Sequence, residues 1–363
     1  MHARFARSMI AGLAVVVGSG TTPCVVAQTC PVFSSATTTG TVASNALVEA
    51  SGIAASRRNP GVLWSHNDSG GSNNVFALGL DGADLGTFTL SGTTAVDWED
   101  IAIGPGPVSG NDYLYIADTG DNFNIRPNVK IYRVPEPTVT PSAPAGNVTL
   151  SGVQTITLVY PDGSRDAETL MVDINGDLYI VTKRVSAHGR VYRAAFPQST
   201  SSTITLEFVD EIPWGAVNGN GGATGGDIAH DGSAVIVRRA SGFSPAATLW
   251  RRAPGTSLAE VFAQPGCDVA MPSEPQGEAV AFSPHDLGFY TISEGTHQPI
   301  HCTPQVHAPG DVNGDDVVNI ADLLAVITTW GPCPQPPLQC TGDADDSGAV
   351  DVNDLLIVIT NWD

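Results

Sequence analysis

The chain has 363 residues and a formal net charge of −21, from 16 Lys and Arg against 37 Asp and Glu. This acidic balance disfavours nucleic acids and anionic lipid surfaces as partners, because both attract basic proteins. Hydrophobic residues make up 42% of the chain, enough for a sizeable core, while 39 Gly and 26 Pro against 15% charged residues favour a mainly β protein rich in turns.

The N-terminus has the organisation of a secretory signal peptide. A basic start, "MHARFAR", precedes the apolar run "MIAGLAVVVG", which is too short to span a bilayer, and "VVA" ending at Ala27 offers small residues for cleavage. The sequence therefore predicts a signal peptide over residues 1–27, a mature start at Gln28, and a secreted or periplasmic/extracellular protein without a membrane span. An uncleaved N-terminal anchor is the alternative.

Export permits disulfides, and cleavage after Ala27 leaves an odd number of cysteines. Cys333 and Cys340 close a short Pro-rich loop and form the easiest pair. Cys30 is expected near Cys267 or Cys302 if the ends of the first domain meet. The cysteines lack the CxxC spacing of a zinc site.

Residues 28–304 contain a loose repeat with a spacing of roughly 50–70 residues. Each unit opens with a short strand and continues with further short alternating strands. The five opening strands are "SGIAAS" at Ser51, "EDIAIG" at Glu99, "ETLMVD" at Glu168, "GDIAHD" at Gly226 and "GEAVAFS" at Gly277. This pattern predicts a β-propeller of five or six blades over residues 28–304, with a pair of β-sandwiches as the alternative.

The mature N-terminus around "TVASNALV" can supply the outer strand of the last blade and so close the ring, which removes an exposed edge. A sixth blade would have to come from the residues before Ser51 or from the stretch 137–165.

Charged residues recur where the opening strands begin and where the second strands end, and in a propeller these positions converge on one face around the central channel. The candidate catalytic residues are Glu99, Glu168 and Glu278, and the candidate ligand-binding residues are Asp100, Asp118, Lys183, Asp227, Arg238 and Glu294. Carboxylates roughly 5–9 Å apart can cleave glycosides, and carboxylates that hold Ca²⁺ beside Lys and Arg can act on phosphate esters. The alternative is that the repeated acids only pin neighbouring blades together. The strand phrases resemble secreted bacterial propellers of the NHL, TolB and phytase-like types.

The C-terminus contains a second, sharper repeat. "GDVNGDDVVNIADLL" begins at Gly310 and "GDADDSGAVDVNDLL" at Gly342, an offset of 32 residues that also carries Trp330 to Trp362. Each copy is a polar loop followed by an apolar run of helical length. A twelve-residue loop that binds Ca²⁺ supplies oxygens from positions 1, 3, 5, 7, 9 and 12. The predicted ligands are Asp311, Asn313, Asp315, the Val317 carbonyl, Asn319 and Asp322 in the first copy, and Asp343, Asp345, Ser347, the Ala349 carbonyl, Asp351 and Asp354 in the second.

Position 6 of such a loop needs a left-handed backbone, which Gly348 supplies and Asp316 tolerates less well. Val318 and Val350 at position 8 suit two loops packed back to back. We therefore expect two Ca²⁺ ions as cofactors of a small all-α module over residues 311–363, joined to the propeller by a linker at 305–310. A pair of acidic turns that cap helices without metal is the alternative.

Two loop–helix repeats of this kind at the end of an exported chain resemble a type I dockerin, over about residues 309–363. The resemblance implies two calcium-loaded F-hand loops, EF-hand-like in chemistry, and a cohesin-like partner, as in polysaccharide-degrading assemblies. The chain departs from the family at loop positions 10 and 11, where Ile320-Ala321 and Val352-Asn353 replace a Ser-Thr-like pair.

Two functions follow as hypotheses. In the first, the dockerin-like module docks or displays a ligand-binding propeller, either on a partner or on an intramolecular surface, with a polysaccharide or another extracellular ligand in the channel. In the second, the channel carboxylates make the chain an extracellular hydrolase of glycosidic bonds or phosphate esters.

Overall fold

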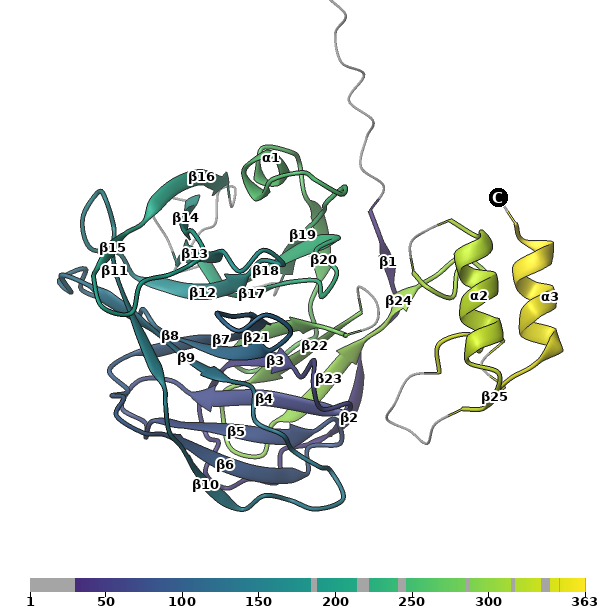
Figure 1. The fold of residues 1–363 in the computed structure, drawn as a ribbon, viewed down its shortest axis with the longest axis horizontal. Helices are drawn as coiled ribbons and strands as arrows, with labels where there is room; N and C mark the ends of the chain where they lie inside the picture. Colours follow the sequence, from purple (N-terminus) through teal and green to yellow (C-terminus); the bar gives the residue numbers. More distant parts are fainter. Residues whose placement is uncertain are drawn as a thin grey trace, which may run out of the picture.

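A computed structural model describes residues 30–183, 188–213, 222–240, 246–284, 288–314, 317–333, 340–345 and 347–362. The predicted signal peptide, residues 1–27, lies outside these ranges. The described part of the chain is mainly β, with short helices near the C-terminus (Figure 1). In the described ranges, no helix is long and apolar enough to cross a membrane.

Within the described residues, five sheets of four or five strands form the blades of a five-bladed β-propeller. Blades 1 and 2 have an added fifth strand. Blade 1 contains β3 (Ala50–Ala55), β4 (Val62–Asn67), β5 (Asn74–Gly79), β6 (Asp84–Leu90) and β10 (Asn147–Leu150). Blade 2 contains β7 (Trp98–Pro105), β8 (Asp112–Asp118), β9 (Val129–Pro135), β11 (Gln154–Val159) and β15 (Ile204–Thr205).

The remaining blades have four strands each. Blade 3 contains β12 (Ala167–Val172), β13 (Leu178–Thr182), β14 (His188–Ala194) and β16 (Glu207–Pro213). Blade 4 contains β17 (Gly222–Ile228), β18 (Ala234–Ala240), β19 (Ala246–Arg251) and β20 (Cys267–Ala270), with the short helix α1 (Leu258–Phe262) before its last strand. Blade 5 contains β21 (Gly277–Phe282), β22 (Phe289–Ser293), β23 (Pro299–Thr303) and β2 (Thr37–Thr41).

The first strand of each blade lies innermost, and these strands contact one another in a closed ring: β3 with β7, β7 with β12, β12 with β17, β17 with β21, and β21 with β3. Strands of the blade interiors are buried on both faces because a neighbouring blade covers each side. Trp64, Phe88, Trp98 and Tyr132, for example, pack between blades 1 and 2. The five predicted opening strands are therefore real, although β17 begins at Gly222, before the predicted Gly226.

The N-terminal segment closes the ring as predicted, although its strand ends at Thr41, where the predicted stretch "TVASNALV" begins. β2 pairs antiparallel with β23, with Thr37 opposite Cys302, so the first described strands complete the last blade. Farther out, β1 (Val32–Phe33) pairs with β24 (Gln305–Val306), which lies within the predicted linker. The stretch 137–165 forms no extra blade: its strand β10 pairs parallel with β6, and β11 belongs to blade 2. The β-sandwich alternative is therefore wrong.

A disulfide between Cys30 and Cys267 ties this N-terminal segment to β20, which selects one of the two pairings left open by the sequence. We expect Cys30→Ser to lower the free energy of unfolding by about 2–4 kcal/mol, because the bond restricts a long segment of the unfolded chain. Urea titration measures the loss, with Cys302→Ser as the control because Cys302 lies outside both disulfides. An unchanged midpoint for Cys30→Ser would contradict the role of this bond in ring closure.

The C-terminal residues form a helical pair, with α2 (Ile320–Thr328) and α3 (Val352–Thr360) side by side (Figure 1). Val318, Val326, Val350 and Val358 form its small core. The pairing of β25 (Gly331–Pro332) with β26 (Ala349–Val350) and the predicted Cys333–Cys340 disulfide connect the two halves.

Candidate functional sites

A β-bulge interrupts the innermost strand of every blade at the same level of the channel. Bulges commonly re-aim a side chain, and they are frequent beside functional sites. The residues at or within the five bulges are Ser51, Glu99, Glu168, Thr224 and Glu278. The three candidate catalytic glutamates therefore occupy equivalent positions around one mouth of the channel.

Acids from neighbouring elements join these glutamates. One carboxylate oxygen each from Glu99, Asp166 and Glu168 lies within 4.8 Å of the others, and the same holds for Asp68, Asp97 and Glu99. Glu99 thus belongs to both groups, which we call the two channel triads. Glu99 and Glu168 are each only 3% exposed.

The predicted ligand-binding residues Lys183 and Glu294 also reach this mouth. The Lys183 ammonium forms an ion pair with Glu168 Oε1. Glu278 accepts a hydrogen bond from the Ser51 hydroxyl over 3.3 Å and shares another with Glu294. The structure therefore brings together Glu99, Glu168, Glu278, Lys183 and Glu294 from the predicted set.

The environment of the mouth favours protonated carboxyls. Burial, followed by repulsion from Glu168 and Asp68, raises the pKa of Glu99 well above its usual range. Burial and the neighbouring charge of Glu278 raise the pKa of Glu294 to about 8. Burial also raises the pKa of Glu168, although the Lys183 ammonium opposes that shift. Crowded carboxyls that resist ionisation are a feature of cation sites and of acid–base catalysts.

Three other predicted residues, Asp100, Asp227 and Arg238, form hydrogen bonds between neighbouring blades. The Asp100 carboxylate accepts hydrogen bonds from the amides of Ile101 and Leu170, each over 2.8 Å, which joins β7 to β12. Asp227 uses the same arrangement between β17 and β21: it accepts from the amides of Ile228 at 2.8 Å and Phe282 at 2.9 Å.

Asp227 also lies away from the acidic mouth, because it lines a small cavity with Arg57, His230 and Pro284. Arg238 donates to the Ala279 carbonyl and to Glu274, again between blades 4 and 5. In the structure, Asp100, Asp227 and Arg238 thus link neighbouring blades.

Asp118 positions a loop beside the channel mouth. Its carboxylate pairs with Arg126 over 2.8 Å and accepts a hydrogen bond from the Asp97 amide over 3.2 Å. These contacts fix the loop that follows β8 against the start of β7.

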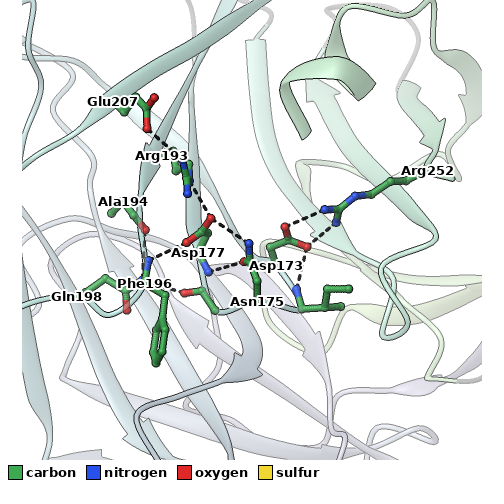
Figure 2. Close-up of polar contacts among 11 residues, drawn as sticks. Asp173, Asn175, Asp177, Arg193, Ala194, Phe196, Gln198, Glu207 and Arg252 are labelled. Atoms are coloured by element: carbon green, nitrogen blue, oxygen red, sulfur yellow. Dashed lines mark hydrogen bonds and ion pairs between the residues drawn. The ribbon is translucent and has the colours of Figure 1, made fainter. Parts of the chain in front are cut away.

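Two buried acids beyond the opposite end of β12, Asp173 and Asp177, are each paired with an arginine (Figure 2). Asp173 forms two hydrogen bonds with Arg252, which joins blade 3 to blade 4, and Asp177 pairs with Arg193 and accepts from the Phe196 amide. No comparable set of bases surrounds the acids of the channel mouth within the described residues, where Lys183 and Arg126 form the ion pairs.

The burial of Asp227 gives a pH prediction. Burial raises its pKa to about 6, although the nearby Arg57 charge opposes that shift. The folded state thus keeps a proton that the unfolded state releases at lower pH, so the unfolding free energy falls as pH rises from about 4 to 6. This component amounts to about 3 kcal/mol. Asp227→Asn should remove this pH dependence of the unfolding free energy, measured by urea titrations across the range. Asp268→Asn, at an exposed side chain, should retain it. The same pH dependence in Asp227→Asn and wild type would show that Asp227 does not cause it.

The C-terminal loops form the second candidate site. In the second loop, Asp343, Asp345 and Asp354 each direct a carboxylate oxygen to within 4.8 Å of the others. The Ser347 hydroxyl lies 3.1 Å from the Ala349 carbonyl and 3.5 Å from Asp343. Asp351 caps α3 by accepting from the Asn353 amide, and Gly348 has the predicted positive φ of 88°. This set of hard oxygen donors fits Ca²⁺.

The described part of the first loop repeats this geometry. Asp322 accepts from the amides of Val312, Asn313 and Asn319, just as Asp354 accepts from Ala344, Asp345 and Asp351. Asn319 caps α2, and Asp311 accepts from the Gly314 amide. The Val317 carbonyl accepts from the Asn319 amide group over 3.0 Å. The predicted ligand Asp315 and its neighbour Asp316 lie outside the described residues.

The two halves of the module also pack reciprocally. A Cβ at Gly310 would lie 3.0 Å from Val358 Cα on α3, and one at Gly342 would lie 3.2 Å from Val326 Cα on α2. These positions differ by the same offset of 32 residues as the sequence repeat. The described parts of the two repeats therefore contact each other through equivalent positions.

Sequence reasoning missed Asp97 and Asp166 as members of the channel mouth. A signal was available, because each stands two residues before a bulge glutamate, in "DWE" and "DAE". The predicted ligand-binding set also lacks Asp68, which follows β4 and belongs to one of the triads.

No protein-family model matches the sequence, and no curated protein matches it. Among solved structures, the chain is similar to PQQ-bound aldose sugar dehydrogenase from Streptomyces coelicolor, at 12% identity and a TM-score of 0.41 over 76% of this chain and 100% of that chain. It is also similar to the β-propeller domain of Cps50 (Swd1) from Myceliophteria thermophila, at 13% identity and a TM-score of 0.38 over 74% and 99% of the two chains. A putative oxidoreductase (glucose dehydrogenase) from Thermus thermophilus shows 13% identity and a TM-score of 0.37 over 72% and 85%. These likenesses are remote and say nothing about the ligand.

Proposed function

We propose that this chain is an exported calcium-binding protein whose C-terminal module docks its propeller on a partner protein. The observation that carries the proposal is the convergence of oxygen donors in a loop that occurs twice with the same capping geometry. Asp343, Asp345, Ser347, the Ala349 carbonyl and Asp354 would hold one ion, and the matching positions of the first loop would hold the other. Calcium would neutralise a segment that contains no Lys or Arg between residues 309 and 363.

The docking surface in this proposal consists of two apolar stripes. Each stripe runs along one helix at spacings of four, three and three residues and ends at a Trp two residues beyond that helix. The first stripe is Ile320, Leu324, Ile327 and Trp330, and the second is Val352, Leu356, Ile359 and Trp362. Their side chains are between 46% and 56% exposed, whereas the valines on the opposite faces of the same helices are buried. Exposed apolar residues gathered on one small domain often mark an interaction site.

The resemblance to type I dockerins supports a cohesin module as the partner, because that family uses its calcium-ordered helices to bind cohesins. The apolar residues Ile320 and Val352, where the family often has Ser, would then change which cohesin is bound. The propeller would be the displayed domain, with its acidic mouth as the ligand-binding site.

The test is the binding of the full chain to a panel of purified type I cohesin modules, measured by isothermal titration calorimetry with calcium and with chelator. We expect calcium-dependent binding, and we expect the double variant Leu324→Asp/Leu356→Asp to lose it at least about 100-fold, because charge enters an apolar interface. Val108→Asp, at an exposed apolar position of the propeller, is the matched control. Equal binding by the double variant, or binding that survives the chelator, would contradict the proposal.

A second candidate function, hydrolysis at the channel mouth, is supported by the closeness of the Glu99 and Glu168 oxygens and by their raised pKa values. Retaining glycosidases hold two carboxyls about 5 Å apart. The test is turnover of a panel of polysaccharides and phosphate monoesters. Under this hypothesis Glu99→Gln and Glu168→Gln abolish turnover while the fold survives, and a folded wild-type chain without turnover would exclude these substrates.

A further inference from the structure

Among the described residues, the channel mouth contains more carboxyl groups than basic side chains that pair with them. Lys183 pairs with Glu168, and Arg126 pairs with Asp118. Asp97, Glu99 and Asp166 form no ion pair with the described part of the chain, and the Glu99 carboxylate accepts no hydrogen bond from it. Acids this close and this buried are costly unless a proton or a cation neutralises them.

Glu168 supplies an independent indication of a ligand. Its Oε1 pairs with Lys183, but its Oε2 is fully buried and has no hydrogen-bond partner among the described residues. Buried carboxylate oxygens are rarely left unpaired, and an unpaired one in a native fold often marks an ion or a water that completes its coordination. Glu168 also contributes an oxygen to the triad with Glu99 and Asp166, so this group lies beside the other acids.

The spacing of the oxygens suits a large hard cation. Three oxygens that lie within 4.8 Å of one another are all within about 2.8 Å of one point, so small side-chain movements bring them to the Ca²⁺–oxygen distance of about 2.3–2.6 Å. Mg²⁺ needs shorter bonds of about 2.0–2.1 Å and near-octahedral geometry, so it would require the carboxylate oxygens to move closer together than Ca²⁺ does.

From these observations we infer that the propeller mouth holds a calcium-class divalent cation between the two channel triads, separate from the C-terminal loops. Asp97, Glu99, Asp166 and Glu168 are the protein ligands, and Asp68 completes the set. The site depends on the propeller alone, so it stands whether or not the C-terminal module binds calcium.

Gly120 positions two of these ligands. A Cβ at this residue would lie 2.1 Å from Glu99 Oε1 and 2.5 Å from Asp97 Oδ2, so only glycine lets both carboxylates occupy their present places. Its backbone is held by a hydrogen bond from its amide to the Asp97 carbonyl and by Arg126, which donates to the Gly120 carbonyl. Gly120→Ala therefore keeps every carboxylate of the site but displaces those of Glu99 and Asp97.

The experiment counts calcium ions per folded full chain by equilibrium dialysis, in wild type and in Glu99→Gln, Gly120→Ala and Asp268→Asn. Asp268 is an acid of the propeller surface whose side chain is 90% exposed, and it serves as the matched control. With both C-terminal loops active we expect about three ions for wild type and the control, against about two for Glu99→Gln. Gly120→Ala should weaken the third site roughly 10- to 100-fold without removing a ligand.

The count also separates this inference from the C-terminal proposal. If the C-terminal loops bind nothing, wild type should hold one ion and Glu99→Gln none, which still supports the channel site. If wild type and Glu99→Gln bind the same number of calcium ions, the proposed channel site is wrong. If Glu99→Gln fails to fold by circular dichroism, Asp97→Asn at a half-buried position replaces it, and the same comparison decides.

Discussion

Chelation of calcium from the full chain should unfold the C-terminal helical pair while the propeller remains folded. The module buries little: its core is four valines with a few partly buried neighbours, and its acids repel one another without cations. A tightly bound ion contributes about 4 kcal/mol when its free concentration is 1,000 times its Kd, so two ions can account for most of the stability of so small a unit.

Hydrogen–deuterium exchange resolves this effect by segment. Amides of residues 320–328 and 352–360 should lose protection in chelator, whereas the blade strands should keep theirs. Asp345→Asn, which removes one charged ligand and retains its size, should require more calcium for the same protection. Protection of both helices that is unchanged by chelator would show that the loops are acidic caps without metal.

Breaking the ion pair between Arg238 and Glu274 should destabilise the propeller by about 3–5 kcal/mol, because the surviving partner would be a buried charge. Both side chains are 1% exposed, and their Nη2 and Oε2 atoms lie 2.5 Å apart. Arg238 also donates to the Ala279 carbonyl over 2.9 Å, so it links blade 4 to blade 5. Gly277 passes so close that a Cβ there would lie 2.0 Å from the guanidinium.

The matched control is the next residue along the strand. Arg239 pairs with Asp268, whose side chain is 90% exposed, so the loss of that ion pair should cost no more than about 1 kcal/mol. We expect Arg238→Met and Glu274→Leu each to lower the urea midpoint strongly, and the double variant to recover part of the loss. Single variants no worse than Arg239→Met would mean that this pair does not hold the blades together.

The propeller is predictable from sequence because its repeat has a physical basis: each opening strand needs a short apolar run, since a neighbouring blade covers each side. The blade count was not predictable. The stretch 137–165 lacks a regular sequence pattern. Its strand β10 joins the edge of blade 1 by pairing with β6, a strand more than fifty residues earlier in the chain.

The site was predictable in part. Glu99, Glu168 and Glu278 share a position that a repeat alignment detects, and the structure adds a β-bulge at each of these positions. Asp100 and Asp227 have the same local sequence character, yet they bind backbone amides of the next blade. A single sequence does not distinguish these roles, because the partner is a main-chain group of a distant strand.

The most direct test of the account is an anomalous difference map from crystals of the full chain grown with calcium. We expect one peak in each C-terminal loop, bounded by Asp311 and Asp322 in the first and by Asp343 and Asp354 in the second. Loops that fold as described without an anomalous peak, at calcium concentrations that saturate other hard-oxygen sites, would contradict calcium-dependent docking as the function of this chain.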